Sequence, residues 1–186
     1  LADSLVREEF FREALDYYRL AAERDPDPVA GLVRLGDAYL KQDFVTLARE
    51  SYLQALDLAP GDPAAEVGLG RTMLAVGQRQ EAEEIFNRHA LGGDPYPPAR
   101  YYLARSFVTT ERNFDQAEQL LRDYLAGHLN FHWPSRAVAN WQLALAQEKT
   151  GRYDQAWQTM SLAMSLPLGN DQMKSDAQRM EFMAKD

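Results

Sequence analysis

The sequence predicts an all-α fold in which helix-turn-helix units stack as a solenoid, and two observations lead to this prediction. Alanine (26) and leucine (24) are abundant among the 186 residues, whereas valine (8) and isoleucine (1) are scarce. Alanine and leucine are strong helix formers and β-branched residues favour strands, so this composition favours helices. The second observation is a repeat of 34 residues, and such a period is typical of stacked two-helix units.

The repeat consists of columns in which similar residues recur at the same interval. Small residues of this kind allow two helices to approach closely, and the aromatic residue four positions after each alanine lies on the same helix face. The columns are Ala14, Ala48 and Ala82; Tyr18, Tyr52 and Phe86; Leu35, Leu69 and Leu103; Gly36, Gly70 and Ala104; and Pro26 and Pro60.

Two insertions interrupt the repeat. One extra residue lies within 109–113. The spacing from Ala48 to Gly70 is 22 residues, whereas that from Ala117 to Ala144 is 27, which places five extra residues within 127–134. After the second insertion the columns continue through Ala144 and Ala156 with the original spacing.

We expect one array over 1–186, with two helices in each repeat. Gly77 and Gly151 mark turns between the helices of a pair, and Asp62-Pro63 and Asp94-Pro95 are typical of helix starts, with Asp as the N-cap. The first repeat is partial, so we expect a preceding repeat in a longer protein. The repeats are expected at 1–26, 29–62, 63–95, 96–128 and 135–168, with helices at 2–9, 11–24, 28–41, 44–58, 62–76, 78–89, 96–109, 113–126, 135–149 and 152–165.

A last helix is expected at 170–184. Met173, Ala177, Met180 and either Met183 or Ala184 recur at helical spacing and form one apolar face. A solenoid needs a helix that covers its last apolar face, so we interpret this segment as a cap. A partner-facing or dimerising helix is the alternative, since methionine-rich faces adapt to varied contacts.

The best copy of the repeat resembles the tetratricopeptide repeat (TPR) family. The copy at 29–62 has the large-Leu-Gly-Tyr and Ala-aromatic-Ala-Pro pattern of that family. Its matching residues are Leu32, Leu35, Gly36, Tyr39, Ala48, Tyr52, Ala55 and Pro60. The resemblance implies a right-handed α-solenoid, in which the first helix of each repeat lines a concave groove that binds a peptide or helix of a partner protein.

The same resemblance implies which columns face a ligand. In this sequence they place Val33, Arg34, Asp37, Val67, Arg71, Leu74, Tyr101, Arg105, Val108, Trp141 and Leu145 in the groove, with Leu40, Gly68, Tyr102, Gln142 and Glu148 in the same columns. Aromatic and arginine residues are enriched at binding hot spots, and arginine binds carboxylates through paired hydrogen bonds. Two alternatives remain open: the arginines pair with acids on neighbouring repeats, and Tyr101 and Trp141 pack against an adjacent helix.

Two departures from the family refine this expectation. One subclass binds acidic C-terminal peptides with lysine, asparagine and arginine, but here Asp37, Gly68 and Gln142 stand where asparagine is needed. We therefore do not predict binding to chaperone tails. The insertion at 127–134 is the second departure: Phe131 and Trp133 either tuck onto the solenoid or contact a partner.

Composition and motifs favour no catalytic or metal site. The absence of cysteine excludes thiolate metal sites and cysteine nucleophiles. His128 and His132 lie on the irregular insertion without a nearby carboxylate, and Gly68-Leu69-Gly70 lacks the third glycine of a phosphate-binding loop. We expect neither enzyme activity nor a cofactor.

The partner is expected to be a protein or peptide. A net charge of −8 disfavours nucleic acid, and no apolar stretch approaches the ~20 residues of a membrane span. We expect a soluble, cytoplasmic or periplasmic scaffold or assembly factor that is a monomer or a weak homodimer. The alternative is a structural segment that serves as a spacer or mediates oligomerisation in a larger multidomain protein.

Overall fold

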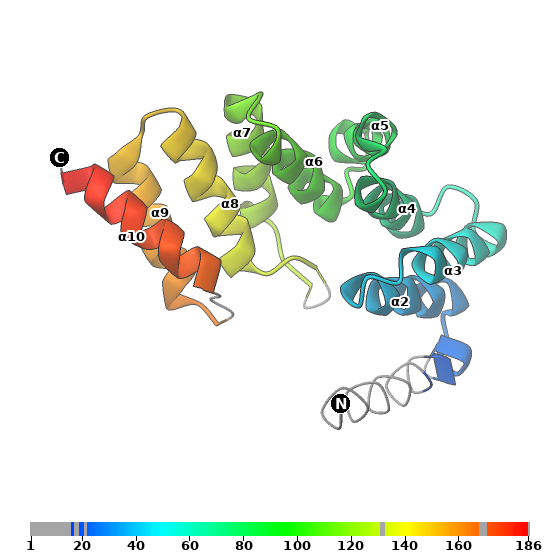
Figure 1. Ribbon diagram of the computed structural model, residues 1–186. Helices are drawn as coiled ribbons and strands as arrows, with labels where there is room; N and C mark the ends of the chain where they lie inside the picture. The colour runs from blue at the N-terminus through cyan, green and yellow to red at the C-terminus, as the bar shows by residue number, and fades with distance from the viewer. Residues whose placement is uncertain (1–15, 17–18, 21, 131–132, 168–170, 186) are drawn as a thin grey trace, which may run out of the picture. The chain divides into compact units, whose positions relative to one another are not determined.

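The computed structural model describes residues 16, 19–20, 22–130, 133–167 and 171–185 (Figure 1), and within these ranges the chain contains helices and no strand. The helix expected at 2–9 and much of the one expected at 11–24 lie outside the described residues. The remaining helices match their predicted positions closely. They are α2 (Pro28–Lys41), α3 (Val45–Leu58), α4 (Pro63–Ala75), α5 (Arg79–Leu91), α6 (Pro97–Thr109), α7 (Phe114–Ala126), α8 (Arg136–Lys149), α9 (Tyr153–Ser165) and α10 (Asp171–Lys185).

Aspartate caps start two of the helices. Asp27 Oδ1 accepts hydrogen bonds from the backbone nitrogens of Val29 at 3.1 Å and Ala30 at 3.2 Å. Asp62 Oδ1 accepts one from Ala65 at 2.8 Å, as the sequence predicted. A proline follows each cap, where its missing N–H leaves no intrahelical bond unmade.

The predicted cap at Asp94-Pro95 is wrong. Helix α6 begins at Pro97, after an extended Tyr96 that provides no side-chain cap. The Tyr96 N–H donates to the carbonyl of His89 at 2.8 Å, which ties this residue back to α5. Residues 92–95 therefore connect the two helices, and the later proline takes the first helical position.

The same turn closes the first helix of each described pair. A residue with positive φ follows the helix end: Asp43 at 64°, Gly77 at 83°, Glu111 at 52° and Gly151 at 75°. The next N–H then bonds back to the last helical turn, for example from Phe44 to Tyr39 O at 3.0 Å. This is a Schellman closure. The turn at 110–113 is one residue longer than the others, and the extra Asn113 also has a positive φ of 49°.

The chain forms two compact units, residues 1–85 and 86–186, with α5 crossing the boundary. In unit 1, α3 packs against both α2 and α4. The Tyr52 ring of α3 is buried against two glycines of these helices. An added Cβ would lie 2.6 Å from Tyr52 Cε1 at Gly36 and 2.4 Å at Gly68, so glycine is required at both positions.

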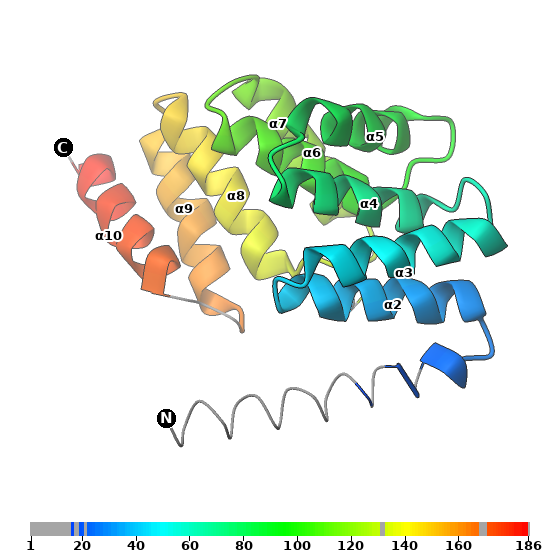
Figure 2. The ribbon, with the colours of Figure 1, turned by 45° about the vertical axis from the view of Figure 1, so that its right-hand side comes forward.

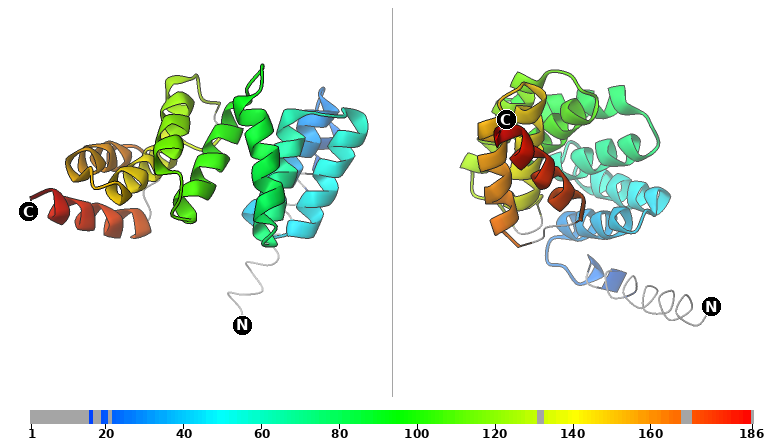
Figure 3. Two further views of the ribbon diagram at one scale, coloured as in Figure 1. Left: turned by 90° about the horizontal axis from the view of Figure 1, so that it is seen from above. Right: turned by 60° about the vertical axis from the view of Figure 1, so that its left-hand side comes forward.

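In unit 2, α6 and α7 pair, α8 and α9 pair, and α10 lies along α9 (Figures 2 and 3). The core around α10 comprises Ala144, Ala156, Met160, Ala163, Met173, Ala177 and Met180. The expected apolar face of α10 therefore caps the last helix pair. The buried face ends at Met180, because Met183 is 38% exposed.

Helix α10 also keeps the 34-residue register. Four buried positions of α8 recur 34 residues later as four buried positions of α10. They are Ala139, Gln142, Leu143 and Ala146 in α8, and Met173, Asp176, Ala177 and Met180 in α10. The cap thus has the packing pattern of the first helix of a repeat. The predicted fold class, an all-α solenoid of stacked helix pairs with a capping helix, is confirmed.

Candidate protein-binding surface

The surface of interest is formed by the first helix of each pair, α2, α4, α6 and α8, in the columns that the family resemblance assigns to ligands. We call it the A face and describe it separately for each unit. In unit 1 its residues are Val33, Arg34, Asp37, Leu40, Val67, Arg71 and Leu74. In unit 2 they are Tyr101, Tyr102, Arg105, Val108, Trp141, Leu145 and Glu148.

Both arginines of the unit 1 A face pair with acidic side chains. Arg71 of α4 forms an ion pair with Asp37 of α2, whose Oδ1 also accepts a hydrogen bond from Tyr52 Oη at 2.8 Å. Arg34 forms an ion pair with Asp25. These contacts correspond to the alternative in which the arginines pair with neighbouring acids, and they compensate both charges locally.

The apolar side chains of this face serve the core. Val67 is only 2% exposed. Val33 and Leu40 are half-buried and pack against the cluster of Tyr39, Ala48 and Tyr52. Leu74 is also half-buried. Unit 1 therefore presents a largely neutral and partly apolar A face.

Arg105 of α6 differs from the arginines of unit 1. Its side chain is exposed, and among the described residues it forms no hydrogen bond or ion pair. In unit 1 the corresponding column brings Arg71 to Asp37, whereas in unit 2 the next residue of the column is the apolar Leu145. The Arg105 guanidinium is therefore left without a counter-charge.

The aromatic residues expected in the unit 2 A face pack internally. Tyr101 is 6% exposed and its ring centroid lies 5.2 Å from that of Tyr102 and 5.8 Å from that of Tyr124. Val108 is 8% exposed. These two side chains support the face from beneath rather than forming its accessible surface.

Helix α10 contacts the A face of α8. Trp141 Nε1 donates a hydrogen bond to Asp176 Oδ2 at 2.9 Å, and Leu145 packs against the core that contains Met173 and Met180. Glu148 accepts hydrogen bonds from Arg179 at 2.6 and 2.8 Å. The bond to Glu148 raises the pKa of Arg179. Trp141 thus follows the packing alternative, because α10 occupies the next position along α8.

The insertion at 127–134 is anchored near both of its ends. Tyr124 Oη donates to Pro134 O at 2.6 Å, and Arg136 donates to the carbonyls of Leu125 at 2.7 Å and Gly127 at 3.1 Å. Trp133 lies edge-on to Tyr96 with ring centroids 5.9 Å apart, which fits the tucked alternative for this residue. Phe131 lies outside the described residues. Burial raises the pKa of Tyr124, so its hydroxyl remains a donor.

The sequence-based predictions missed an exposed apolar end of α10. Phe182 is 66% exposed and Met183 is 38% exposed. The 34-residue period offered a signal, since it carries the Glu148 column onto Phe182. Beside this end lies an open pocket of about 440 Å³, lined by Glu148, Lys149, Tyr153, Arg179 and Met183.

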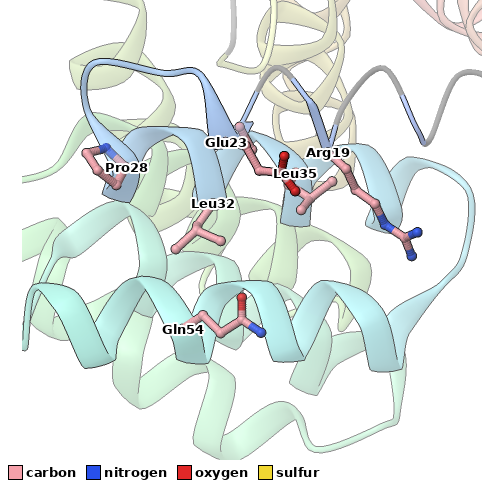
Figure 4. A pocket seen from close by; sticks show the side chains of 7 residues that line it. Arg19, Glu23, Pro28, Leu32, Leu35 and Gln54 are labelled. Atoms are coloured by element: carbon pink, nitrogen blue, oxygen red, sulfur yellow. The ribbon is translucent and has the colours of Figure 1, made fainter.

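A second pocket belongs to unit 1 (Figure 4). It measures about 280 Å³, and Leu32 and Leu35 of α2 contribute apolar side chains, whereas Gln54 of α3 contributes a polar one. Arg19, Ala22, Glu23 and Pro28 complete the lining. Arg19 Nε donates a hydrogen bond to Tyr39 Oη at 2.9 Å, so its guanidinium is engaged.

Two further classes of site were considered. Within the described ranges, no three histidine, aspartate or glutamate side chains gather in a way that could hold a metal ion. His128 is exposed, and His132 lies outside those ranges. None of the described helices combines the length and the hydropathy needed to cross a bilayer.

Comparison with known proteins agrees with this architecture. Residues 1–63 match the family model described as tetratricopeptide repeat. No curated protein matches the sequence.

Solved structures share the fold at low identity. A thermophilic TPR protein of Thermus thermophilus superposes with a TM-score of 0.70 at 16% identity, covering 96% of this chain and 94% of its own. PilF of Pseudomonas aeruginosa gives 0.70 at 14% identity, covering 84% and 69%. MamA gives 0.56 at 22% identity, covering 89% and 93%. The family match and the repeated helix pairs together identify the chain as a tetratricopeptide repeat protein.

Proposed function

We propose that this chain is a non-enzymatic scaffold that binds a segment of a partner protein on its A face. Membership of the TPR family supports the general role, because TPR proteins usually act as scaffolds that bind other proteins. The observation that carries the specific proposal is Arg105, which is exposed and has no counter-charge among the described residues, whereas Arg34 and Arg71 are paired.

The chemistry of Arg105 favours a carboxylate of the partner. Guanidinium presents planar donors that match a carboxylate through two parallel hydrogen bonds. In a chain of net charge −8, an arginine without a nearby acid is a local exception that attracts acidic ligands. An acidic side chain or a C-terminal carboxylate therefore fits this position.

Other residues of the A face have supporting roles in this proposal. In unit 1, Val33 and Leu74 offer partly accessible apolar surface, and the pair of Arg71 and Asp37 can hydrogen-bond a partner backbone at its exposed edge. In unit 2, the buried Tyr101 and Val108 hold α6 in place beneath Arg105.

Capture of partners from an extract of the source cells tests the proposal. We expect Arg105→Glu to abolish recovery of proteins that the wild-type chain retains, because repulsion replaces attraction at the carboxylate. Arg49→Glu is the matched control, since Arg49 is an exposed arginine on α3, the second helix of its pair. Equal recovery by both variants would refute the role of Arg105.

The alternative, a segment that mediates oligomerisation, finds less support at the face first suggested for it. Met173 and Met180 are fully buried within unit 2 and are not accessible to a second copy. Sedimentation equilibrium would detect a dimer that uses another surface, and a stable dimer unaffected by Arg105→Glu would favour this alternative.

A further inference from the structure

We propose that α10 is part of the binding surface as well as a cap, and that Phe182 holds an apolar side chain of the same partner segment whose carboxylate binds Arg105. This inference rests on the proposed function. Its first support is the register: α10 repeats the burial pattern of α8 at 34 residues, so Arg179 and Phe182 occupy the columns of Leu145 and Glu148. Helix α10 thereby adds one more strip to the A face of unit 2.

The exposure of Phe182 is the second support. At 66% it is the most exposed of the large hydrophobic side chains in the described residues. Met183 beside it is 38% exposed and lines the pocket of about 440 Å³ with Tyr153. Aromatic side chains next to a concave site supply much of the binding energy at protein interfaces. Covering Phe182 and Met183 would remove this apolar surface from water.

The charges between the two anchors suit an acidic segment. Glu148 lies between Arg105 and Phe182 in the A face, but its side chain is only 11% exposed because Arg179 covers it. Asp176 is 4% exposed and is bound by Trp141 and Arg179. The acids of this surface are thus shielded, while the guanidinium of Arg179 is 47% exposed. A carboxylate approaching Arg105 therefore meets little repulsion.

The spacing of the helices defines the partner more closely. Helix α6 contacts α8, and α8 is bonded to α10 through Trp141 and Glu148. Neighbouring helices lie about 8–10 Å apart, so Arg105 and Phe182 are about 20 Å apart. An extended chain advances about 3.3 Å per residue. The occupant is therefore an extended segment with a carboxylate and, about six residues away, an aliphatic or aromatic side chain.

Selection from phage-displayed random peptides of about 12 residues, on the full chain, provides the probe, because that length spans both anchors. We expect the selected peptides to share an acid and an apolar residue about six positions apart. Binding of the selected peptides, labelled with a fluorophore, is then measured by fluorescence polarisation. Arg105→Glu and Phe182→Ser should each weaken binding about tenfold or more, whereas Arg49→Glu and the exposed, second-helix variant Leu162→Ser should not.

A double-mutant cycle locates the contact. Replacing the apolar residue of the peptide by serine should weaken binding to the wild-type chain but not further weaken binding to Phe182→Ser. If Phe182→Ser binds like wild type while Arg105→Glu is weakened, this inference is overturned and the proposed function stands. If neither variant is weakened, or if the selected peptides share no such pattern, both are overturned. Phe182→Leu, which keeps an apolar side chain, should retain most of the affinity.

Discussion

The hydroxyl of Tyr52 donates a hydrogen bond to Asp37 at 2.8 Å, and the ring of the same residue is buried against Gly36 and Gly68. One side chain of α3 therefore sets the approach of α2 and α4, and it also orients the acid that pairs with Arg71. This arrangement links packing in unit 1 to the charge balance of its A face.

Replacing the glycines beside Tyr52 should destabilise unit 1. Gly36→Ala and Gly68→Ala would each place a methyl group inside the Tyr52 ring, and overpacking of this kind costs about 1–3 kcal/mol. Urea unfolding followed by circular dichroism measures the loss. Gly93→Ala is the control, because no atom lies within 4 Å of a Cβ built there. Equal stability of all three variants would contradict the packing role of Tyr52.

The closing turns of the first helices offer a gain in stability. Asp43 has φ of 64°, a region where glycine is unstrained and other residues are not. We expect Asp43→Gly to raise the free energy of unfolding by about 0.5–1 kcal/mol. Gly77→Ala, at φ of 83°, should lower it by about 1 kcal/mol. Thermal unfolding of the pair checks both signs, and a change in the same direction for both would be inconsistent with this account.

Stability should fall at alkaline pH through Tyr124. Burial raises its pKa in the folded protein above the ordinary value of 10.0, so the folded state holds the proton more tightly than the unfolded state does. The resulting stabilisation is present below about pH 10 and is lost as the pH rises further. Urea unfolding between pH 8 and pH 11, a range of about three units around that value, should show a smaller alkaline loss for Tyr124→Phe. Identical pH profiles would argue against a buried, protonated Tyr124.

The contact between α8 and α10 should depend on Trp141. Trp141→Phe removes the donor at 2.9 Å from the buried Asp176, and leaving that carboxylate short of a partner costs about 1–3 kcal/mol. Amide hydrogen exchange should accelerate in α10 more than in α6. Trp157→Phe is the control, because Trp157 packs against the same core and none of its hydrogen bonds reaches α10. Unchanged exchange in α10 would show that apolar packing alone holds the cap.

The helices were predictable from sequence because their signals are local. Asp62 and Pro63 are adjacent, and the small residues that keep the period recur regardless of what surrounds them. The start of α6 was missed because three prolines lie close together, and the bond from Tyr96 to His89 decides which of them begins the helix.

The charges and the accessible surface were less predictable, because they depend on neighbours across helices. Arg71 and Arg105 occupy the same column, yet one meets Asp37 and the other lies beside a column that continues as Leu145. Trp141 was expected to face a ligand, but α10 keeps the repeat interval and bonds to it through Asp176. The family pattern assigns columns, whereas pairing across helices decides which members of a column remain accessible.

The continuation of the interval into α10 has a consequence for protein engineering. This helix already stacks as the opening half of another unit, and Gln178 stands at its surface where Ala144 stands in α8. In a redesigned chain, Gln178→Ala would create the seat for the large side chain of a grafted second helix. The molecule could thus be lengthened in modular steps, with each added unit supplying new side chains for recognition.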